Sequence, residues 1–478
     1  MQKYLPQSTG VLWWGVALFF LLAVFMLLPI QPNDYWWYLR LGSDILREGH
    51  IPTTDSYSFT RAGQPMVYHS WLSAVLFWAL YRLGGLTLTV AVRALILAAT
   101  FTIVWHTARQ TGASARVAAA VTLLAAMVGS NNWAMRPQIF AYPLFALMLW
   151  QLWRWLRGKK SHWWIFALLM LLWVNLHGSF VLGFLLVGAA LAGGGGNRRE
   201  MAISLGGITI AALLNPRGWR VWQYVWTLLT DPASQHFGAE WQPPTLHTWQ
   251  GALFFGVLVA LLLLIGWNFR AGRAKLSGTE WLWLAGFSIM AIIAVRYGIW
   301  FAMVVTPIAT KQLCALRDRR MRANRGIPAL NAAFLAMFIV LPLALLPGIR
   351  EKWWADAPPV LSADTPVAAV EWLAAHPELP DGLWNDLAFS SYLIFALPQR
   401  PVWIDTRFEL YPPAQWKTYR AIADAVSDWD ARLDAAEISV LMLNPAATPK
   451  LVSAVESSSD WQKVYGDDTA QIYVKVNP

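Results

Sequence analysis

The stretch that decides the fold is Val11-Leu-Trp-Trp-Gly-Val-Ala-Leu-Phe-Phe-Leu-Leu-Ala-Val-Phe-Met-Leu-Leu-Pro-Ile30, an apolar run near the N-terminus. A helix needs about 20 apolar residues to cross a hydrocarbon core about 30 Å thick, and this run has that length. It lacks a small-residue cleavage site. We therefore interpret it as a retained first membrane span, with Lys3 on the cytoplasmic side, and not as a signal peptide.

The composition of the whole chain indicates the same class of protein. Of its 478 residues, 57% are hydrophobic and 13% are charged, whereas soluble domains carry about 25% charged residues. The mean hydropathy is +0.42. The 31 tryptophans are of a type that concentrates at bilayer interfaces. These values exclude an ordinary soluble enzyme and a disordered protein, and they predict a polytopic α-helical membrane protein.

The charged residues give a topology signal. The chain has 37 Lys and Arg against 27 Asp and Glu, a net charge of +10, and basic residues collect in cytoplasmic loops. No basic patch on a soluble face suggests nucleic-acid binding. Cys314 is the only cysteine, so no intramolecular disulfide can form. Basic clusters at 154–160, 198–199, 270–275 and 317–325 mark the expected cytoplasmic loops.

Apolar segments continue to about Leu346, and we expect about 11–12 of them. Their number is ambiguous before Arg154, where the stretches are 69–83, 86–106, 117–129 and 137–155. Four crossings would place Arg154 outside, so one stretch must be re-entrant, lie flat or combine with a neighbour. We expect this to be 117–129, because it is the shortest and is followed by polar residues.

The tail differs from the rest because it has no run long enough to span a membrane. Thr365 as N-cap and Pro366 at the first helical position predict a helix to Ala375. Strands are expected at 402–404, 439–443 and 471–476, with a hairpin turn at 466–469. The sequence thus predicts a membrane domain over residues 1–348, with its first outer loop at 31–68, and a small extracytoplasmic α/β domain over residues 349–478.

The first outer loop begins Gln31-Pro-Asn-Asp-Tyr-Trp-Trp-Tyr-Leu-Arg-Leu-Gly-Ser-Asp-Ile-Leu-Arg-Glu-Gly-His50. Its pattern is amphipathic and predicts a helix that lies in the membrane interface. The expected apolar face holds Trp37, Leu41, Ile45 and Leu46, and the expected solvated face holds Arg40, Asp44, Arg47 and Glu48.

Asp34 lies where the first span leaves the bilayer. A carboxylate at that depth can take a proton from a hydroxyl acceptor while a lipid-linked donor lies in the membrane, and general-base catalysis typically contributes about 10²–10⁴-fold. The alternative is that Asp34 caps the interfacial helix, since Asn and Asp are favoured N-cap residues.

Several motifs of the chain are similar to those of a known family. The chain resembles the integral-membrane glycosyltransferases of the C superfamily (GT-C), which include protein O-mannosyltransferases, the lipid A aminoarabinose transferase and oligosaccharyltransferases. It resembles more closely a set of uncharacterised bacterial proteins of that type, and the resemblance covers essentially the whole chain. The motifs are Asp34-Tyr-Trp-Trp-Tyr-Leu-Arg-Leu-Gly42, Pro52-Thr-Thr-Asp-Ser-Tyr-Ser-Phe-Thr60, Trp173-Val-Asn-Leu-His-Gly178, Leu214-Asn-Pro-Arg-Gly-Trp219, Gly382-Leu-Trp-Asn-Asp386 and Trp403-Ile-Asp-Thr-Arg-Phe-Glu-Leu-Tyr411.

The resemblance implies a polyprenyl-phosphate-linked sugar donor, inversion at the sugar carbon and an active site outside the cytoplasm. It makes Asp34 the expected base. Many members place a second acidic residue beside this one, or use an Asp-x-Asp pattern for a metal. Here the neighbours are Asn33 and Tyr35, so no metal or other cofactor is favoured, although a divalent metal stays open because Asp55 could fold back to join Asp34.

Basic residues in the expected outer regions are candidates for binding the donor phosphate. Arg136, Arg217 and Arg296 lie against the general charge bias, and arginine binds phosphate through a planar fork. The alternative is snorkelling toward lipid headgroups. His177, at an outer hairpin, could bind phosphate or simply cap a helix end.

Acceptor and sugar binding has a second set of candidates. Aromatic faces pack on the C–H surfaces of sugars, so the tryptophans of the first loop are expected to form a platform. Glu240 could position the acceptor or be a solvated loop acid. Asp405 and Arg407 in the tail are expected to form only a local ion pair. The full set of acceptor and sugar-binding candidates is Asp55, His69, Trp36, Trp37 and Glu240.

The predicted function is therefore that of a glycosyltransferase in a bacterial inner membrane, with many spans and a periplasmic tail. It would move a sugar from the lipid-linked donor to a glycan, lipid or protein acceptor at the periplasmic face. The other interpretations are a transporter or flippase of a lipid-linked glycan, or a non-catalytic scaffold of an envelope polysaccharide machine. A transporter would explain the same arginines but does not need Asp34 at the surface.

Overall fold

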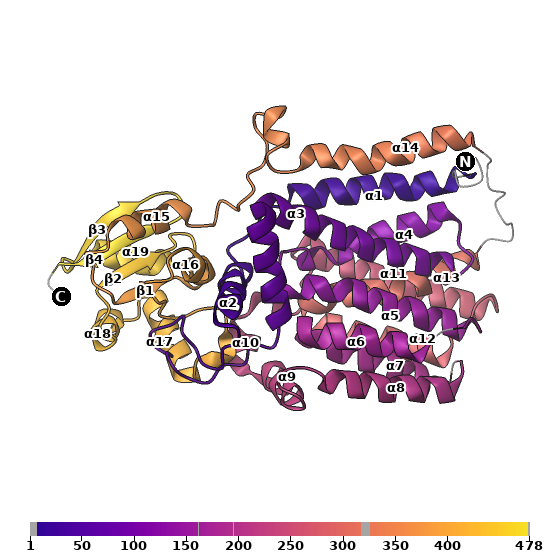
Figure 1. The fold of residues 1–478 in the computed structure, drawn as a ribbon, viewed down its shortest axis with the longest axis horizontal. Helices are drawn as coiled ribbons and strands as arrows, with labels where there is room; N and C mark the ends of the chain where they lie inside the picture. The colour runs from indigo at the N-terminus through magenta and orange to yellow at the C-terminus, as the bar shows by residue number, and fades with distance from the viewer. Residues whose placement is uncertain (1–6, 161, 195, 317–325, 477–478) are drawn as a thin grey trace. The chain divides into compact units, whose positions relative to one another are not determined.

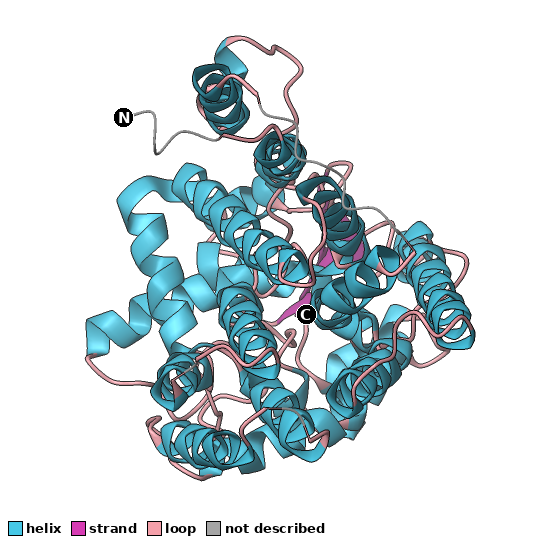
Figure 2. Cartoon of the chain, turned by 90° about the vertical axis from the view of Figure 1, so that its right-hand side faces the viewer, coloured by secondary structure: helices cyan, strands magenta, loops and turns pink. Residues whose placement is uncertain are grey.

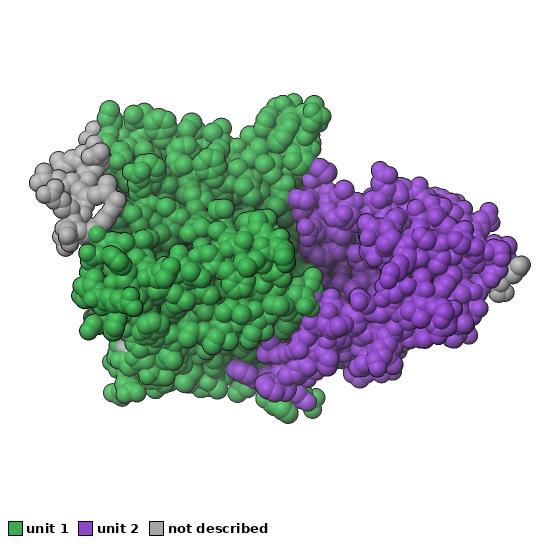
Figure 3. All heavy atoms as spheres, turned by 180° about the vertical axis from the view of Figure 1, so that it is seen from behind, with its two compact units in different colours: residues 1–28, 84–221, 239–358 green, residues 29–83, 222–238, 359–478 purple. Residues whose placement is uncertain are grey.

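The computed structural model describes residues 7–160, 162–194, 196–316 and 326–476, so Lys3 and the basic loop at 317–325 lie outside the described residues. The chain forms two compact units (Figure 3). Unit 1 contains residues 1–28, 84–221 and 239–358, and unit 2 contains 29–83, 222–238 and 359–478. The units differ from the expected domains, because residues 29–83 and 222–238 are grouped with the tail, and the boundary before the tail falls after residue 358 and not after 348.

Unit 1 is a bundle of apolar helices (Figure 1), many of which are seen end-on in Figure 2. Helix α1 packs beside α4 and α14, and α6 packs beside α8. Short 3-10 turns connect several of these helices. The helices include α1 (Gly10–Leu27), the second half of α3 (Trp71–Arg109), α4 (Ala115–Val128), α5 (Ala141–Leu156), α6 (Trp163–Leu176), α7 (Val181–Ala192), α8 (Arg198–Leu213), α11 (Trp249–Arg270), α12 (Gly278–Ile293), α13 (Gly298–Cys314) and α14 (Pro328–Val340).

Among the described residues, four helices are long and apolar enough to cross a membrane by length and composition. They are α1, α3, α11 and the segment Pro328–Leu345. Several further helices are apolar but shorter, including α6 and α12. A polytopic helical architecture with a small mixed sheet near the C-terminus is thereby confirmed as the fold class.

Helix α3 is broken at Gly84 and Gly85. Gly85 has φ +58° and ψ −150°, a conformation that residues with a Cβ rarely adopt. The boundary between the two units falls at this break, so residues 71–83 belong to unit 2 and the second half belongs to unit 1. The apolar stretches 69–83 and 86–106 thus combine largely in one interrupted helix. The stretch 117–129, for which a re-entrant or flat position was expected, forms α4 and packs within unit 1 against α1 and α13.

Two buried arginines satisfy backbone carbonyls at the C-terminal end of α1. Arg93 Nη2 donates to Phe25 O at 2.9 Å and also bonds Leu28 O. Arg350 Nη1 donates to Met26 O at 3.0 Å. The last carbonyls of a helix have no partner within it, so these side chains complete the end of the first span.

Unit 2 is built on α2 (Tyr35–Glu48), the helix predicted in the first outer loop. It packs against α16 (Ser390–Ala396) and against the first half of α3, where a Cβ on Gly42 would lie 2.1 Å from Ala74 O. Most of α2 is buried, but Leu46 is exposed, against expectation. Other helices of the unit are α10 (Pro232–Phe237), α15 (Val367–Ala375), α17 (Pro413–Ala423), α18 (Trp429–Ala435) and α19 (Pro449–Glu456), and α9 (Arg220–Thr230) begins just before the boundary.

The sheet of unit 2 has the order β1-β2-β4-β3. Strand β1 (Leu383–Asn385) pairs in parallel with β2 (Val440–Leu443), and β4 (Gln471–Lys475) pairs antiparallel with β2 and β3 (Trp461–Gly466). The predicted strands at 439–443 and 471–476 and the hairpin are thus confirmed. The strand expected at 402–404 is wrong: Val402 forms only an isolated bridge to Ser58. Helix α15 forms as predicted, but Pro366 takes the N-cap position without a side-chain cap bond.

Candidate functional site

The carboxylate of Asp34 is half-buried at the start of α2. Asp34 occupies the N-cap position with helical angles, φ −52° and ψ −23°, and its side chain makes no capping hydrogen bond. The neighbouring Asn33 Oδ1 accepts from Tyr35 N at 3.1 Å instead. The structure therefore does not give Asp34 the capping role that was the alternative to catalysis.

Asp34 is held by a residue of the tail. Thr406 Oγ1 donates to Asp34 Oδ1 at 2.7 Å, and Ser391 Oγ lies 3.3 Å from the same threonine oxygen. Both partners belong to unit 2. Thr406 was not among the predicted site residues, although it lies inside the Asp405-Thr-Arg407 motif.

Buried ion pairs fix the turn that carries Thr406. Arg407 Nε donates to Asp405 Oδ1 at 2.9 Å, so the predicted local ion pair is confirmed. Arg407 Nη1 also donates to Asp55 Oδ1 at 2.6 Å and to Tyr68 Oη at 3.1 Å. The Arg407 side chain is 1% exposed. An arginine that bridges two carboxylates in this way ties the first outer loop to the tail within unit 2.

Asp55 is engaged in this network and does not join Asp34 directly. Its carboxylate accepts hydrogen bonds from Tyr57 N, Ser58 N and Ser58 Oγ as well as from Arg407. Burial alone would raise the pKa of Asp55, but the charge of Arg407 and the hydrogen bonds outweigh it and hold that pKa below its usual value. The geometry thus gives Asp55 a positioning role in unit 2.

The predicted aromatic platform is packed into the interior. Trp36 contacts Tyr392 edge-on and its indole donates to Gln31 O at 3.0 Å. Trp37 stacks on Tyr38, with ring centroids 3.7 Å apart. Both tryptophans are buried, so this arrangement does not favour the stacking of a sugar on them.

His69 is half-buried, and its ring lies 4.7 Å from the ring of Tyr224. The Tyr224 hydroxyl in turn donates to Glu409 Oε1 at 2.5 Å. This arrangement places His69 in a polar and aromatic contact of unit 2.

Asp44 is buried, contrary to the solvated position expected for it. It accepts from Arg40 Nε at 2.9 Å and from Tyr57 Oη at 3.0 Å, and it pairs with Arg47 at 2.8 Å. A buried carboxylate with three partners is a structural group. Asp44 is therefore unsuitable as an inert control for Asp34, whereas Glu48 at the end of α2 is exposed.

A second polar cluster lies in unit 1 and joins three of the predicted residues. Arg136 Nη1 pairs with Glu240 Oε2, and Arg296 Nη1 lies 3.3 Å from Glu240 Oε1. The side chains of Arg136, Glu240 and Arg296 are 27%, 28% and 15% exposed, so solvent reaches the cluster. Arg296 also stacks over Trp241, 4.0 Å from the ring centroid.

The cluster sits on 3-10 turns that are fixed by their own hydrogen bonds. These turns are η2 (Ser130–Asn132), η3 (Pro137–Phe140), η5 (Ala239–Trp241) and η6 (Val295–Tyr297). Asn132 Nδ2 donates to Arg296 O at 3.1 Å, and Val295 N donates to Gln242 O at 2.9 Å. Turns distant in sequence thus bring two arginines to one carboxylate.

Glu240 is charged in this setting. Burial would raise its pKa, but Arg296 and Arg136 outweigh that effect and hold the pKa of Glu240 below its usual value. Two arginines and one ionised glutamate leave a net charge of about +1. Glu240 is therefore a paired carboxylate and not merely a solvated one, and its role toward an acceptor stays a prediction.

The other two predicted phosphate ligands lie elsewhere in unit 1. His177 Nδ1 accepts from Ser179 N at 3.1 Å and caps the turn η4 (Gly178–Phe180), as in the capping alternative. Arg217 lies in the turn between α8 and α9, where its backbone N donates to Asn215 Oδ1 at 2.9 Å. The described hydrogen bonds of these residues do not bring them to Glu240.

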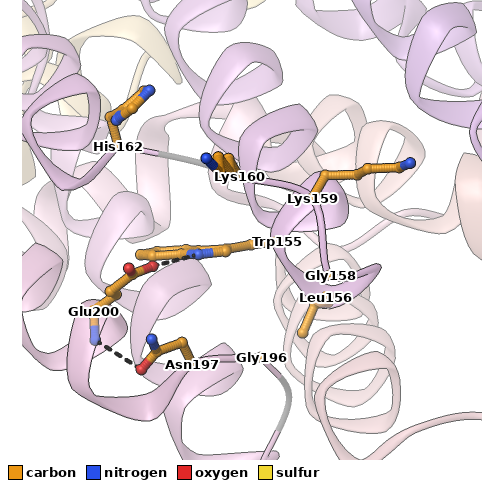
Figure 4. Close-up of a pocket in the computed structure, with 9 residues that line it drawn as sticks. All are labelled: Trp155, Leu156, Gly158, Lys159, Lys160, His162, Gly196, Asn197 and Glu200. Atoms are coloured by element: carbon orange, nitrogen blue, oxygen red, sulfur yellow. Dashed lines mark hydrogen bonds between the residues drawn. The ribbon is translucent and has the colours of Figure 1, made fainter.

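A pocket of about 590 Å³ lies in unit 1 between the loops at 156–162 and 196–200 (Figure 4). Trp155 Nε1 donates to Glu200 Oε2 at 2.9 Å at its wall, and Asn197 caps α8. Lys159 and Lys160 belong to a basic loop expected on the cytoplasmic side. The pocket contains none of the predicted site residues.

Metal binding has no preassembled site in the described part of the chain. Within that part, no group of three or more His, Cys, Asp or Glu side chains is placed to hold a metal ion. The carboxylates of Asp34 and Asp55 are held by Thr406 and Arg407 respectively. Metal independence stays a prediction.

No family model matches the chain, and no curated protein matches it. Solved structures are similar in fold. The oligosaccharyltransferase AglB from Archaeoglobus fulgidus, in complex with an inhibitory peptide and a dolichol-phosphate, is 11% identical with a TM-score of 0.57; the match covers 97% of this chain and 74% of that one. ArnT from Cupriavidus metallidurans is 15% identical with a TM-score of 0.51, over 98% of this chain and 97% of that one.

The arabinofuranosyltransferase AftD from Mycobacteria is 18% identical with a TM-score of 0.56, over 97% of this chain and 41% of that one. Two of these proteins are named as sugar transferases, an oligosaccharyltransferase and an arabinofuranosyltransferase. The chain shares the fold of these proteins, and the predicted resemblance is confirmed at the level of the fold. Identities this low carry the fold and leave function to be argued from the residues.

Proposed function

We propose that this protein is an inverting glycosyltransferase of a bacterial inner membrane. It transfers a sugar from a polyprenyl-phosphate-linked donor to a glycan, lipid or protein acceptor at the periplasmic face. The observation that carries the proposal is the carboxylate of Asp34, half-buried and held by Thr406 within unit 2 of a chain with the GT-C fold. The complex of AglB with a dolichol-phosphate supports a lipid-phosphate donor class.

In the proposed reaction the acceptor hydroxyl oxygen attacks the anomeric carbon from the face opposite the phosphate. The bond between that carbon and the phosphate oxygen breaks, and the lipid phosphate leaves with the bonding electrons. Asp34 accepts the proton of the hydroxyl. Thr406 keeps the carboxylate oriented, because its hydrogen bond occupies one of the two oxygens. The reaction needs no metal in this scheme.

Arg136 and Arg296 bind the donor phosphate in this proposal. Arginine offers parallel N–H groups that match two phosphate oxygens, and the two side chains are partly exposed around one anion already. Loss of a charge-assisted contact to each should cost about 1.5–3 kcal/mol, or roughly 10–150-fold in donor affinity. Arg136→Ala and Arg296→Ala should each weaken donor binding, while Arg217→Ala tests the remaining arginine.

A reconstituted assay tests the function as a whole. The purified full chain in liposomes receives a polyprenyl-phosphate-linked sugar labelled in the sugar, together with glycan, lipid and protein fractions of a bacterial envelope. We expect the label to appear in an acceptor, with release of free polyprenyl phosphate. A flippase would move the intact donor between leaflets without cleaving it, and a scaffold would do neither; either result contradicts the proposal.

A further inference from the structure

Glu240 joins the two arginines in the way that a phosphate would. Its Oε2 pairs with Arg136 and its Oε1 lies 3.3 Å from Arg296 Nη1, so each oxygen serves a different guanidinium. A carboxylate and a phosphate both present two adjacent anionic oxygens to such donors. The two arginines therefore have the arrangement of a phosphate-binding site, and the Glu240 carboxylate occupies the place of the phosphate.

Arg296 is anchored independently of the Glu240 side chain. Arg296 lies on η6, which is fixed by Asn132 through its backbone and by the stacking of Trp241 on the guanidinium. Glu240 lies on η5, in the connection between α10 and α11. All three side chains are accessible to solvent in part, so one anion can replace another without unfolding of the turns.

We infer that Glu240 is a placeholder anion, which holds Arg136 and Arg296 when no donor is bound and yields them to the lipid phosphate. This inference rests on the proposed phosphate-binding role of the two arginines. A built-in competitor lowers the affinity for any lipid phosphate, since the ligand must displace the carboxylate first. When the polyprenyl phosphate leaves after transfer, Glu240 pairs with the two arginines again, which favours release of that product.

The test measures binding of undecaprenyl phosphate to the full chain in detergent, without catalysis. Glu240→Gln keeps the shape and removes the competing charge, so we expect affinity to rise about 10–100-fold. Glu240→Asp keeps the charge but is one methylene shorter, so it cannot reach both arginines equally and should give a smaller rise. Asp356→Asn, an equal change of charge in an exposed loop of the same unit, should leave affinity unchanged.

Two outcomes separate this inference from the proposed function. If Arg136→Ala and Arg296→Ala weaken binding but Glu240→Gln and Glu240→Asp leave it unchanged or weaken it, Glu240 only supports the arginines and the placeholder role is overturned. If the arginine variants bind as tightly as the parent, the phosphate site itself is wrong. Thermal unfolding of each variant shows that it is folded, and the Asp variant decides the matter if the Gln variant does not fold.

Discussion

At the scale of single residues, the contact that matters most joins positions 372 apart in sequence, Asp34 and Thr406. Such a pairing is invisible to sequence patterns, because nothing in the composition of either segment specifies the other. The Asp405-Thr-Arg407 motif predicts a local ion pair, which is confirmed. The motif does not predict that Thr406, the residue between the two charges, donates to Asp34. Asp405 and Arg407 are buried, whereas Thr406 is only half-buried. A half-buried polar residue between two buried ones indicates a side chain that can contact a partner.

Replacing Thr406 tests its role in positioning Asp34. Thr406→Val removes the donor while keeping the volume, so the carboxylate loses a charge-assisted hydrogen bond worth about 1.5–3 kcal/mol. We expect kcat to fall about 10–100-fold, with donor affinity unchanged. Thr406→Ser restores the hydroxyl and should recover most of the rate. A serine variant as slow as the valine variant would assign the loss to packing.

Asp386 predicts a pH dependence of stability in unit 2. It directly follows β1, is buried, and its Oδ2 has no hydrogen-bond partner among the described residues. Burial raises its pKa to about 6, above the value of about 3.9 in an unfolded chain. Its contribution to stability is therefore full below about pH 4 and is lost as pH rises through about 6. The loss amounts to about 3 kcal/mol at most.

The measurement is thermal unfolding between pH 4 and 8, followed by a probe of the tail. Asp386→Asn should flatten the fall in stability between about pH 4 and 6, because the group no longer titrates. Asp428→Asn, an exposed carboxylate of the same unit, should leave the profile as in the parent. A profile that is equally steep in the Asp386 variant would exclude this residue as the cause.

At the scale of helices and strands, the sequence predicted most elements but not where each one packs. The first-loop helix, the tail helix to Ala375 and the hairpin were recoverable because periodicity and turn residues are local signals. The sequence left open which apolar stretch combines with a neighbour, because apolarity alone does not distinguish an interruption within one helix from a loop between two helices. The pair Gly84-Gly85 was the available signal for the break.

The failures among the strands have a similar cause. Residues 402–404 are apolar and buried, yet they form a single bridge, from Val402 to Ser58, and do not join the four-stranded sheet. Strand β1 has only three residues, which is too short for an alternating pattern to show. For the site, the sequence predicted which kinds of residue and which segments take part. It could not predict their contact partners, such as Arg407 for Asp55, because these depend on tertiary packing.

Arg93 donates hydrogen bonds to carbonyl groups at the C-terminal end of α1, and these bonds give a prediction at the scale of helices. Arg93→Met preserves length and volume but leaves Phe25 O and Leu28 O without their donor. Unsatisfied buried carbonyls cost about 1–3 kcal/mol each, so the melting temperature in detergent should fall clearly. Arg116→Met, whose guanidinium stacks on Trp13 with no buried hydrogen bond described, should change it much less. Equal effects would contradict a capping role for Arg93.

At the scale of the whole chain, helix α3 bears on a conflict in the expected topology, because Trp71–Arg109 is one candidate span and not two. With α3 counted as one crossing, we expect α1 to lead outward, α3 inward, α4 outward and α5 inward. Arg154, at the end of α5, is then expected on the cytoplasmic side, as its basic loop predicts. Continued alternation brings α14 outward, and the tail from Arg350 is expected in the periplasm.

Reporter fusions test this topology. Alkaline phosphatase is active only when exported, so a fusion after Pro478 should be active and a fusion at Lys159 should be inactive. The charge bias of the short loops is the physical reason. An inactive enzyme after Pro478 would reverse the orientation of the chain, and with it the side of the membrane on which Asp34 acts.

The central claim is that Asp34 is a base and not a structural carboxylate, and one substitution separates the two. Asn keeps the shape of Asp34 and an oxygen for the Thr406 hydroxyl, but it cannot accept a proton. In the reconstituted transfer assay, Asp34→Asn should lower turnover about 10²–10⁴-fold with unchanged thermal stability and donor binding, while Glu48→Gln at the exposed end of α2 stays active. Full turnover in Asp34→Asn would leave the proposed enzyme without its base and would favour the transporter.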